Sequence, residues 1–146
     1  MGWIDDYQEK SIGVDTAPLI YFIEGNNKYT PIVDPFFQAL DEGEFMVVTS
    51  TITLLEVLVL PLRLGKTDLV AKYREIILDT NNLVIVDVIP DIAEGAARLR
   101  ASYNLRTPDA IQIATTMFMG STTLITNDKE LRRVKDIQIV LLDDLK

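Results

Sequence analysis

The stretch TPDAIQIATTMFMGSTTLITND, residues 107–128, decides the fold that this sequence predicts. In its first half, small and apolar residues recur at helical intervals, which indicates a helix with one buried face. Thr107 is expected to cap this helix, Pro108 suits its first position, and Gly120 is expected to end it. Residues 122–126 follow as a β-prone run, so the stretch predicts a helix followed directly by a buried strand.

One carboxylate stands near each end of this stretch. Asp109 falls in the first turn of the predicted helix, and Asp128 directly follows the predicted strand. Each position has a structural explanation, because the helix dipole favours Asp109 and because Asp128 can cap a helix that begins at Lys129. Side chains at the carboxyl ends of parallel strands, however, commonly line the functional site of an open α/β sheet. Both aspartates are therefore candidate site residues.

Runs of strand length alternate with helical runs through the rest of the chain. Pro61 is expected to kink or end the helix in which it lies. The alternation predicts an α/β fold, a three-layer α/β/α domain around a parallel sheet of four to five strands. Further strands are expected at residues 11–14, 45–49, 83–88 and 137–142, and further helices at residues 18–23, 31–40, 51–65, 66–78 and 90–103.

The length and composition are those of one globular domain. The chain has 146 residues, of which 48% are hydrophobic and 25% charged. We expect a polar lead-in over residues 1–10, anchored by Trp3 and Ile4, and a single domain over residues 11–146. No apolar run has the length of a membrane span, and the first residues lack a signal-peptide pattern. We therefore expect a cytoplasmic protein without a membrane partner.

Two absent residue types limit the possible chemistry. The sequence has no cysteine and no histidine, which excludes disulfides, Ser-His-Asp and Cys-His triads, and nearly all zinc chemistry. Catalysis would have to use carboxylates, hydroxyls, Lys, Arg, Tyr or a hard cation. The net charge of −8 argues against a polyanion-binding protein with a basic surface, but not against one whose carboxylates hold metal ions.

Two further acidic residues stand at informative positions. Asp15 directly follows the predicted strand at residues 11–14, where an ordinary turn aspartate is also common. Glu56 lies in the middle of a helix that is apolar on nearly every side. A glutamate in such a helix either faces solvent or is buried with a partner. Together with the two later aspartates, these residues make four candidate carboxylates.

The motifs around the four carboxylates resemble those of PIN-domain nucleases, and most closely the VapC toxins of bacterial toxin–antitoxin pairs. The resemblance spans residues 12–142. One departure is Ala17, where the family often has a small polar residue. The motifs are VDTAPLI with Asp15, LLEVL with Glu56, TPDAIQIATTM with Asp109 and LITND with Asp128.

The resemblance implies a metal-dependent endoribonuclease that hydrolyses RNA phosphodiester bonds and is the toxin of a toxin–antitoxin pair. It implies that the four carboxylates are catalytic and bind metal, and that the hydroxyls of Thr16 and Thr126 support them. It also implies a homodimer and a cognate antitoxin as the protein partner.

The residue types agree with this chemistry. Carboxylates that share a pocket repel each other, by about 4 kcal/mol for a pair ~4 Å apart at an effective dielectric of about 20, so the pocket raises pKa values or binds cations. Oxygen ligands without His or Cys favour Mg²⁺ or Mn²⁺. We expect Asp15 and Asp109 to be the principal ligands. Asp128 would hold a second ion or the attacking water, and Glu56 would act through a coordinated water.

Basic residues gather on both sides of the stretch at residues 107–128. Such a run usually forms a solvated face, but clusters of this kind also bind phosphates. Arg106, Lys129 and Arg132 are therefore candidates for substrate binding. Half of the 14 Lys and Arg residues flank the stretch, namely Arg98, Arg100, Arg106, Lys129, Arg132, Arg133 and Lys135.

The predicted helix at residues 51–65 carries too many apolar residues for a single buried face. A helix of this kind is either wholly buried or covered by another chain. With the family resemblance in hand, we expect this helix and the one at residues 66–78 to form a groove for an amphipathic antitoxin helix, close to Glu56.

Other functions are compatible with parts of the pattern. The same fold could belong to a housekeeping RNA-processing nuclease, to a DNA-cutting nuclease, or to a degenerate scaffold that only binds partners. A phosphoacceptor receiver domain is also a small doubly wound sheet, and Asp87 lies near the place of its acceptor. A receiver would leave Glu56 and Asp109 without a role, and no Lys follows Leu142 before Lys146.

Overall fold

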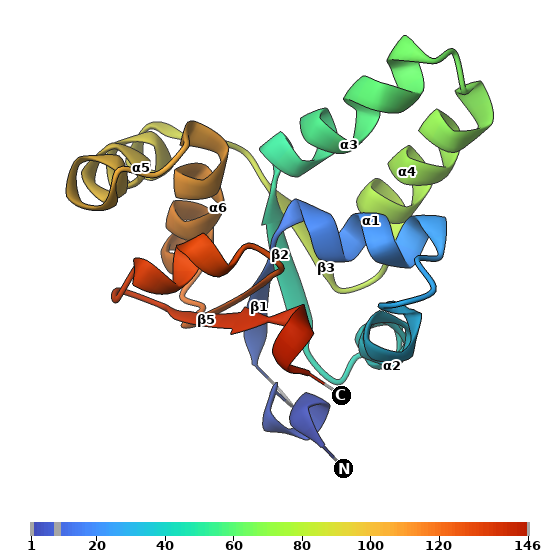
Figure 1. Ribbon diagram of the computed structural model, residues 1–146, viewed down its shortest axis with the longest axis horizontal. Helices are drawn as coiled ribbons and strands as arrows, with labels where there is room; N and C mark the ends of the chain where they lie inside the picture. The colour runs from blue at the N-terminus through green and yellow to red at the C-terminus, as the bar shows by residue number, and fades with distance from the viewer. Residues whose placement is uncertain (1, 8–9, 146) are drawn as a thin grey trace.

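A parallel sheet forms the centre of the protein. The computed structural model describes residues 2–7 and 10–145, and within them the sheet has five strands in the order β3-β2-β1-β4-β5, with every neighbouring pair parallel (Figure 1). The predicted sheet is confirmed. Its order differs from the 2-1-3-4-5 order of receiver domains, so that alternative is wrong. The strands are β1 (Ser11–Val14), β2 (Met46–Ser50), β3 (Leu83–Val86), β4 (Thr123–Thr126) and β5 (Gln138–Leu141).

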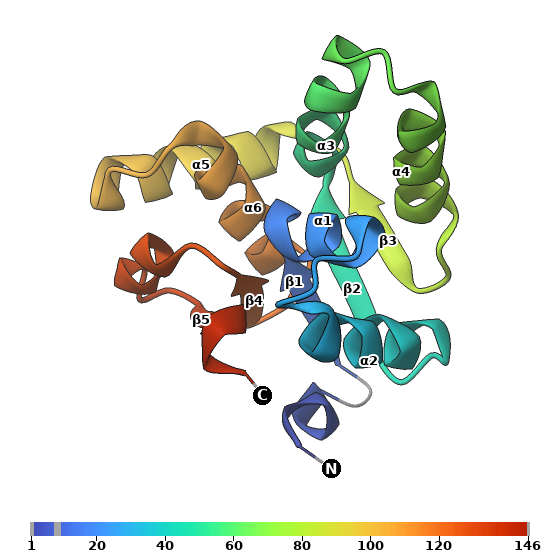
Figure 2. The ribbon, with the colours of Figure 1, turned by 45° about the vertical axis from the view of Figure 1, so that its right-hand side comes forward.

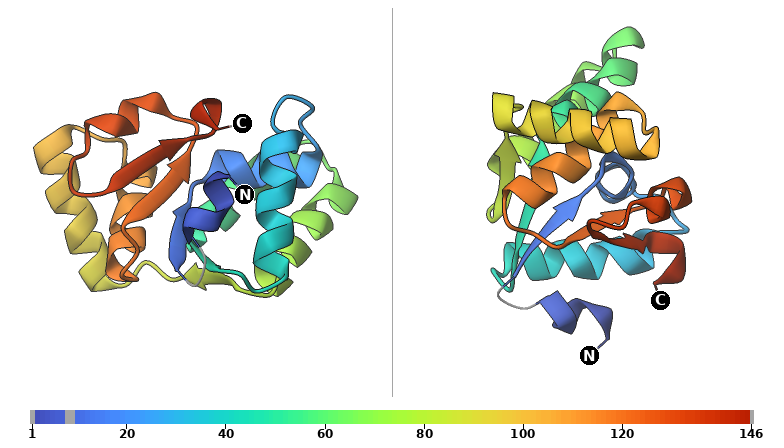
Figure 3. Two further views of the ribbon diagram at one scale, coloured as in Figure 1. Left: turned by 90° about the horizontal axis from the view of Figure 1, so that it is seen from below. Right: turned by 90° about the vertical axis from the view of Figure 1, so that its left-hand side faces the viewer.

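Helices cover both faces of the sheet, which confirms the predicted three layers. One face carries α5 and α6, and the other carries α1 and α2 (Figure 3). The helices α3 and α4 form a hairpin that packs against α1 and β3 and extends away from the sheet (Figure 2). Nowhere in residues 2–7 and 10–145 is a helix both long and apolar enough to cross a membrane. The helices are α1 (Thr16–Glu24), α2 (Thr30–Asp41), α3 (Thr51–Arg63), α4 (Thr67–Asp79), α5 (Pro90–Tyr103) and α6 (Thr107–Phe118), with the short 3₁₀-helices η1 (Trp3–Tyr7), η2 (Lys129–Arg133) and η3 (Leu142–Asp144).

The central strands bury side chains on both faces. Ile12 and Val14 of β1 and Ile125 of β4 belong to the apolar core beneath α1 and α2. Leu124, the neighbour of Ile125, instead joins the core beneath α5 and α6. Successive side chains of a strand point to opposite faces, so a strand covered on both faces has the near-continuous apolar run seen in the sequence.

Some predicted boundaries are wrong by a few residues. Thr107 is the first residue of α6 rather than its cap, because a proline is tolerated anywhere in the first turn and Arg106 takes the cap position. The third strand ends at Val86, where the chain leaves the sheet edge for α5. Pro61 does not end α3, which continues to Arg63. The helix predicted at Lys129 is the 3₁₀-helix η2.

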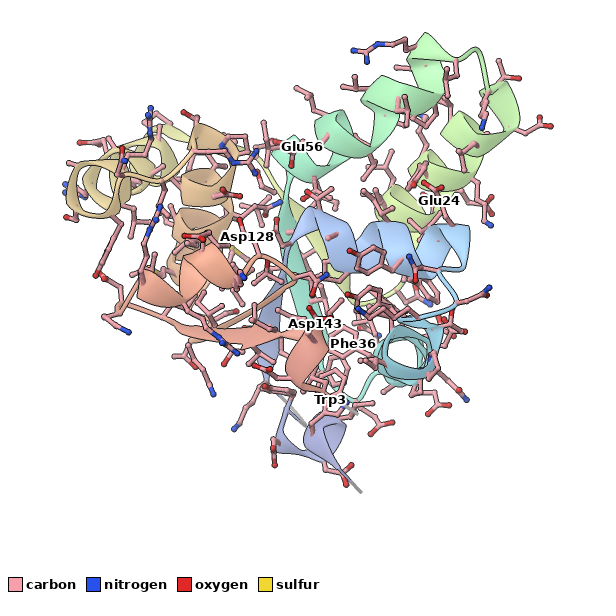
Figure 4. The ribbon with its side chains drawn as sticks, viewed as in Figure 1. Trp3, Glu24, Phe36, Glu56, Asp128 and Asp143 are labelled. Carbon is pink, nitrogen blue, oxygen red and sulfur yellow. The ribbon has the colours of Figure 1, made fainter. Side chains whose placement is uncertain are left out.

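The predicted lead-in, residues 1–10, is anchored as expected, although residues 1, 8 and 9 lie outside the described part of the chain. Trp3 of η1 stacks on Phe36 of α2 with ring centroids 5.4 Å apart, and Figure 4 labels both residues. Ile4 packs against the same core. The lead-in therefore packs against the apolar core at the side of Phe36.

Gly13 allows α6 to approach β1 closely. A Cβ at this position would lie 2.6 Å from Cγ2 of Thr116 in α6. The hydroxyl of Thr116 donates to the carbonyl of Gln112 at 2.8 Å, which fixes the threonine side chain. The contact thus brings α6 against the central strand of the sheet.

Replacing Gly13 by Ala should lower the free energy of unfolding by about 1–3 kcal/mol, because the added methyl group overpacks the contact between β1 and α6. Gly95→Ala is the matched control, because its Cβ would meet the Cβ of Ala114 at an ordinary 3.5 Å. This change within α5 should raise the free energy of unfolding by about 0.5–1 kcal/mol. Chemical denaturation measures both, and equal stability of Gly13→Ala and wild type would contradict the close approach.

Candidate active site

The carboxyl ends of β1 and β4 lie side by side where the strand order reverses. From β1, the strands β2 and β3 lie on one side and β4 and β5 on the other. The backbone N–H of Asp15, the first residue after β1, donates to the carbonyl of Ile125 in β4 at 2.9 Å. Ligands of open α/β sheets bind outside such a switch point.

Asp15 is buried at the switch point and caps α1. It is 9% exposed, and its Oδ1 accepts the backbone N–H of Thr16 at 2.8 Å while its Oδ2 accepts the hydroxyl of Thr126 at 2.8 Å. Burial raises the pKa of Asp15, against these two hydrogen bonds, which favour the ionised form. The negative charges of Asp109 and Glu56 raise the pKa of Asp15 further. Asp15 is therefore both a structural cap and a carboxylate whose ionised form is disfavoured by burial and by the neighbouring negative charges.

All four carboxylates singled out in the sequence line one cleft of about 420 Å³ at the switch point. They come from the end of β1, from α3, from the first turn of α6 and from the residues after β4. Figure 4 labels two of them, Glu56 of α3 and Asp128 ahead of η2. The two supporting threonines also line this cleft. Its other lining residues are Ala17, Ile20, Tyr21, Arg106 and Asn127.

Glu56 is half-buried and has a partner on a neighbouring helix. Its Oε1 accepts the hydroxyl of Thr16, in α1, at 2.8 Å. One turn earlier on α3, the hydroxyl of Thr53 is buried and lies 2.7 Å from that of Thr49 in β2. Helix α3 therefore places its polar side chains toward the sheet end and the cleft, which is the second of the two possibilities for a glutamate in an apolar helix.

Asp109 is buried in the first turn of α6 and is paired with an arginine. It is 6% exposed. Arg106, three residues earlier, places Nε 3.1 Å from Oδ2 and Nη2 3.4 Å from Oδ1. This bidentate arrangement is the strong form of an ion pair, and it contacts both oxygens of Asp109.

Asp128 caps η2 and shares a hydroxyl with Asp15. Its Oδ1 accepts the backbone N–H of Glu130 at 2.9 Å, which is the structural role considered for it from the sequence. Its own backbone N–H donates to the hydroxyl oxygen of Thr126 at 3.1 Å. Because the same hydroxyl donates to Asp15, Thr126 sets the positions of both aspartates.

Gln112 joins α6 to the end of β2 and to α3 by buried hydrogen bonds, and it was not predicted from the sequence. It is 1% exposed, its Oε1 accepts the backbone N–H of Ser50 at 3.3 Å, and its Nε2 donates to the hydroxyl of Thr53. Gln112 follows Asp109 by three residues and so lies on the same face of α6. That spacing is the signal by which it could have been found.

Asn127 connects the end of β4 to α1 and α2, and it was also not predicted. Its Nδ2 donates to the hydroxyls of Tyr21 and Tyr29 at 3.1 and 3.0 Å, and the two rings stack with centroids 4.3 Å apart. Tyr29 in turn donates to Asp143 at 2.6 Å. The buried Oδ1 of Asn127 has no hydrogen-bond partner within the described part of the chain. No local sequence pattern indicates this network, because its members meet only in the fold.

Of the three basic candidates, only Arg106 lines the cleft. Lys129 and Arg132 lie on η2 and are exposed. Arg132 forms an ion pair with Asp144 of η3. Contact of these two residues with a substrate stays a prediction.

The oxygens of the cleft fit a hard divalent cation by type. The lining residues offer carboxylate, hydroxyl and amide oxygens, and the sequence has no His or Cys to favour zinc. Within residues 2–7 and 10–145, however, no three acidic side chains come close enough together to hold an ion. A cation in this cleft would therefore be held in this arrangement by at most two carboxylates, with hydroxyl, amide or water oxygens in its remaining positions.

The fold is shared with solved toxin–antitoxin structures. VapBC2 from Rickettsia felis, bound to a DNA fragment from its promoter, aligns with a TM-score of 0.72 and 18% identity over 90% of this chain and 98% of that one. A toxin–antitoxin complex from Klebsiella pneumoniae aligns with a TM-score of 0.66 and 26% identity over 90% and 97%. Mycobacterium tuberculosis VapC20, a sarcin–ricin loop cleaving toxin, aligns with a TM-score of 0.63 and 19% identity over 77% and 86%.

Comparison with individual sequences and with a family model gives different results. A search of curated protein sequences finds no match. The model of the PIN domain, in contrast, matches residues 12–137, a span that includes all four cleft carboxylates. The resemblance predicted from the four motifs is confirmed, and the chain belongs to the PIN-domain family.

Proposed function

We propose that this protein is a metal-dependent endoribonuclease and the toxin of a toxin–antitoxin pair. The observation that carries the proposal is the gathering of four carboxylates in one cleft of a PIN-domain fold. Among the structural relatives, one is a toxin that cleaves the sarcin–ricin loop, which supports RNA as the substrate here.

Mg²⁺ or Mn²⁺ is the cofactor that suits the cleft oxygens. Asp15 and Asp109 would be its principal ligands, Asp128 would hold a second ion or the attacking water, and Glu56 would act through a coordinated water. When bound, the metal would supply an activated water and stabilise the leaving oxygen of the phosphodiester. Neutralisation of the carboxylates would also let a chain of net charge −8 approach RNA.

The neighbouring hydroxyls would keep the carboxylates in position. Thr126 donates to Asp15 and accepts from the backbone of Asp128, while Thr16 donates to Glu56. The bonds to Asp15 and Glu56 each use one of about four lone-pair sites of the carboxylate, which leaves the others for a cation. We also propose that Lys129 and Arg132, which are exposed on η2, contact RNA phosphates.

The α3–α4 hairpin is the proposed binding surface for the antitoxin. Leu55, Leu60, Leu62 and Leu64 are 56% to 61% exposed, although α3 buries Val57 against α1 and α4. Exposed apolar side chains in this number indicate an interaction site, and an amphipathic helix would lay its apolar face on them. The solved relatives include toxin–antitoxin complexes, which supports an antitoxin as the occupant. We propose a homodimer as the form that binds it.

RNA cleavage should require Mg²⁺ or Mn²⁺ and stop on addition of EDTA. Asp15→Asn and Asp109→Asn should each lower kcat/KM by about 10³-fold or more, because loss of a metal ligand removes several kcal/mol of transition-state stabilisation. Asp91→Asn, at the exposed start of α5, removes the same charge outside the cleft and should cleave like wild type. With folding checked by circular dichroism, full activity of either cleft variant would refute the site assignment.

Without metal, the stability difference between Asp15→Asn and wild type should depend on pH. Because the pKa of Asp15 is raised in the folded chain, the folded state holds this proton more tightly than the unfolded state, and wild type loses stability as pH rises between the two pKa values. The free energy of unfolding of Asp15→Asn should therefore grow relative to wild type as pH rises above about 4.

Urea denaturation in EDTA over this range measures the effect on Asp15→Asn. Asp79→Asn, at the exposed end of α4, is the control for loss of one charge, and its difference from wild type should stay small. A difference between Asp15→Asn and wild type that does not change with pH would show that the Asp15 charge costs the folded protein nothing.

Leu62→Asp should abolish antitoxin binding and leave metal-dependent cleavage intact, because it places a charge on the apolar hairpin surface and away from the cleft. Phe118→Asp, at a residue 48% exposed at the end of α6, is the matched control and should still bind the antitoxin. Co-purification with the antitoxin measures binding, and sedimentation measures the oligomeric state. Normal binding by Leu62→Asp would place the antitoxin on another surface.

A further inference from the structure

Arg106 forms an ion pair with the buried carboxylate of Asp109, although its own side chain is exposed. The side chain of Arg106 is 75% exposed and that of Asp109 is 9% exposed. Both Nε and Nη2 of the guanidinium nevertheless reach the two carboxylate oxygens, at 3.1 and 3.4 Å. The arginine thus closes over Asp109 from the solvent side of the cleft.

Arg106 is the cation of the acidic cleft. Among the described residues, no other Lys or Arg lines it. The hydrogen bond to Asp109, and then the negative charges of Asp109, Asp128 and Glu56, raise the pKa of Arg106. The guanidinium therefore offsets part of the repulsion among the carboxylates.

A divalent cation on Asp109 would use the oxygens that Arg106 already contacts. The lone pairs of the carboxylate are not all used, but a guanidinium and a divalent ion on one carboxylate repel each other. The two cations therefore compete.

We propose that Arg106 is an exchangeable counter-ion, which neutralises Asp109 before metal binds, leaves when the carboxylates take the metal, and then pairs with a phosphate of the RNA. This inference rests on the proposed function. It assigns to one residue opposite effects on the two ligands, competition with the metal and attraction of the RNA.

The position of Arg106 permits the exchange. Its carbonyl accepts the backbone N–H of Ala110 at 3.0 Å, so the main chain is held at the start of α6 while the side chain can turn. The side chain of Arg106 is 75% exposed, so it returns to solvent at little cost, while the arriving metal replaces it as the cation on Asp109. The released guanidinium would stay at the rim, where its planar fork suits a phosphate.

Arg106→Gln in the full-length, metal-stripped protein tests the exchange. Calorimetric titration with Mn²⁺ should give a dissociation constant lower than that of wild type by about threefold or more, because the competing cation is absent. In RNA cleavage at saturating Mn²⁺, the KM should rise. The slope of log KM against log salt should also fall by about 0.7, as expected for one lost phosphate contact on a single strand.

Two further variants complete the design. Arg74→Gln, on an exposed part of α4, removes the same charge away from the cleft. It should change neither the Mn²⁺ dissociation constant nor the KM and its salt dependence. Arg106→Lys keeps the competing charge without the fork, so its Mn²⁺ affinity should stay closer to wild type than that of Arg106→Gln. If Arg106 were only a structural support for Asp109, both substitutions at position 106 would instead weaken Mn²⁺ binding.

Unchanged or weaker Mn²⁺ binding by Arg106→Gln overturns the inference, even when wild type cleaves RNA. Failure of the proposed function has a different signature. In that case wild type does not cleave RNA, and Asp109→Asn binds Mn²⁺ as tightly as wild type does.

Discussion

The parallel pairing of β1 with β4 is the constraint on which the rest of the site depends. Because these strands are neighbours at the centre of the sheet, the residues that follow them must lie side by side. Asp15 and Thr126 therefore meet in a hydrogen bond. Helix α6, seated closely on β1 over Gly13, begins at the same end of the sheet and adds Asp109. A different strand order would separate these groups, whatever their identity.

The fold keeps like charges together by surrounding them with donors. Thr126 and Thr16 each donate to one carboxylate, and Arg106 donates to another. Beneath the cleft, Gln112 and Thr53 belong to a buried network that joins α3, α6 and β2. Buried polar networks of this kind are rigid when every member is satisfied. The carboxylates are thus held on a hydrogen-bonded base, while Arg106, the partner of Asp109, is largely exposed to solvent.

The acidic residues could be predicted from the sequence because their positions, taken together, match the motifs of PIN-domain nucleases. Asp15 and Asp128 interrupt the chain at strand ends, and Glu56 is a charge within an apolar helix. The strand order and the supporting residues could not be predicted in the same way. Gln112 and Asn127 are neutral amides whose partners are distant in the chain, so only the tertiary fold gives them a role. The exact start of a helix such as α6 does not follow from its proline, because a proline is tolerated throughout a first turn.

The hairpin of α3 and α4 also limits how concentrated the isolated chain can become. Its leucines are exposed in the folded state, so self-association does not require unfolding. The net charge of −8 opposes this attraction through long-range repulsion, which salt screens at the ionic strength of a cell. The hairpin is therefore one surface at which folded chains can associate without unfolding. A partner that covers it would also protect the folded chain from self-association.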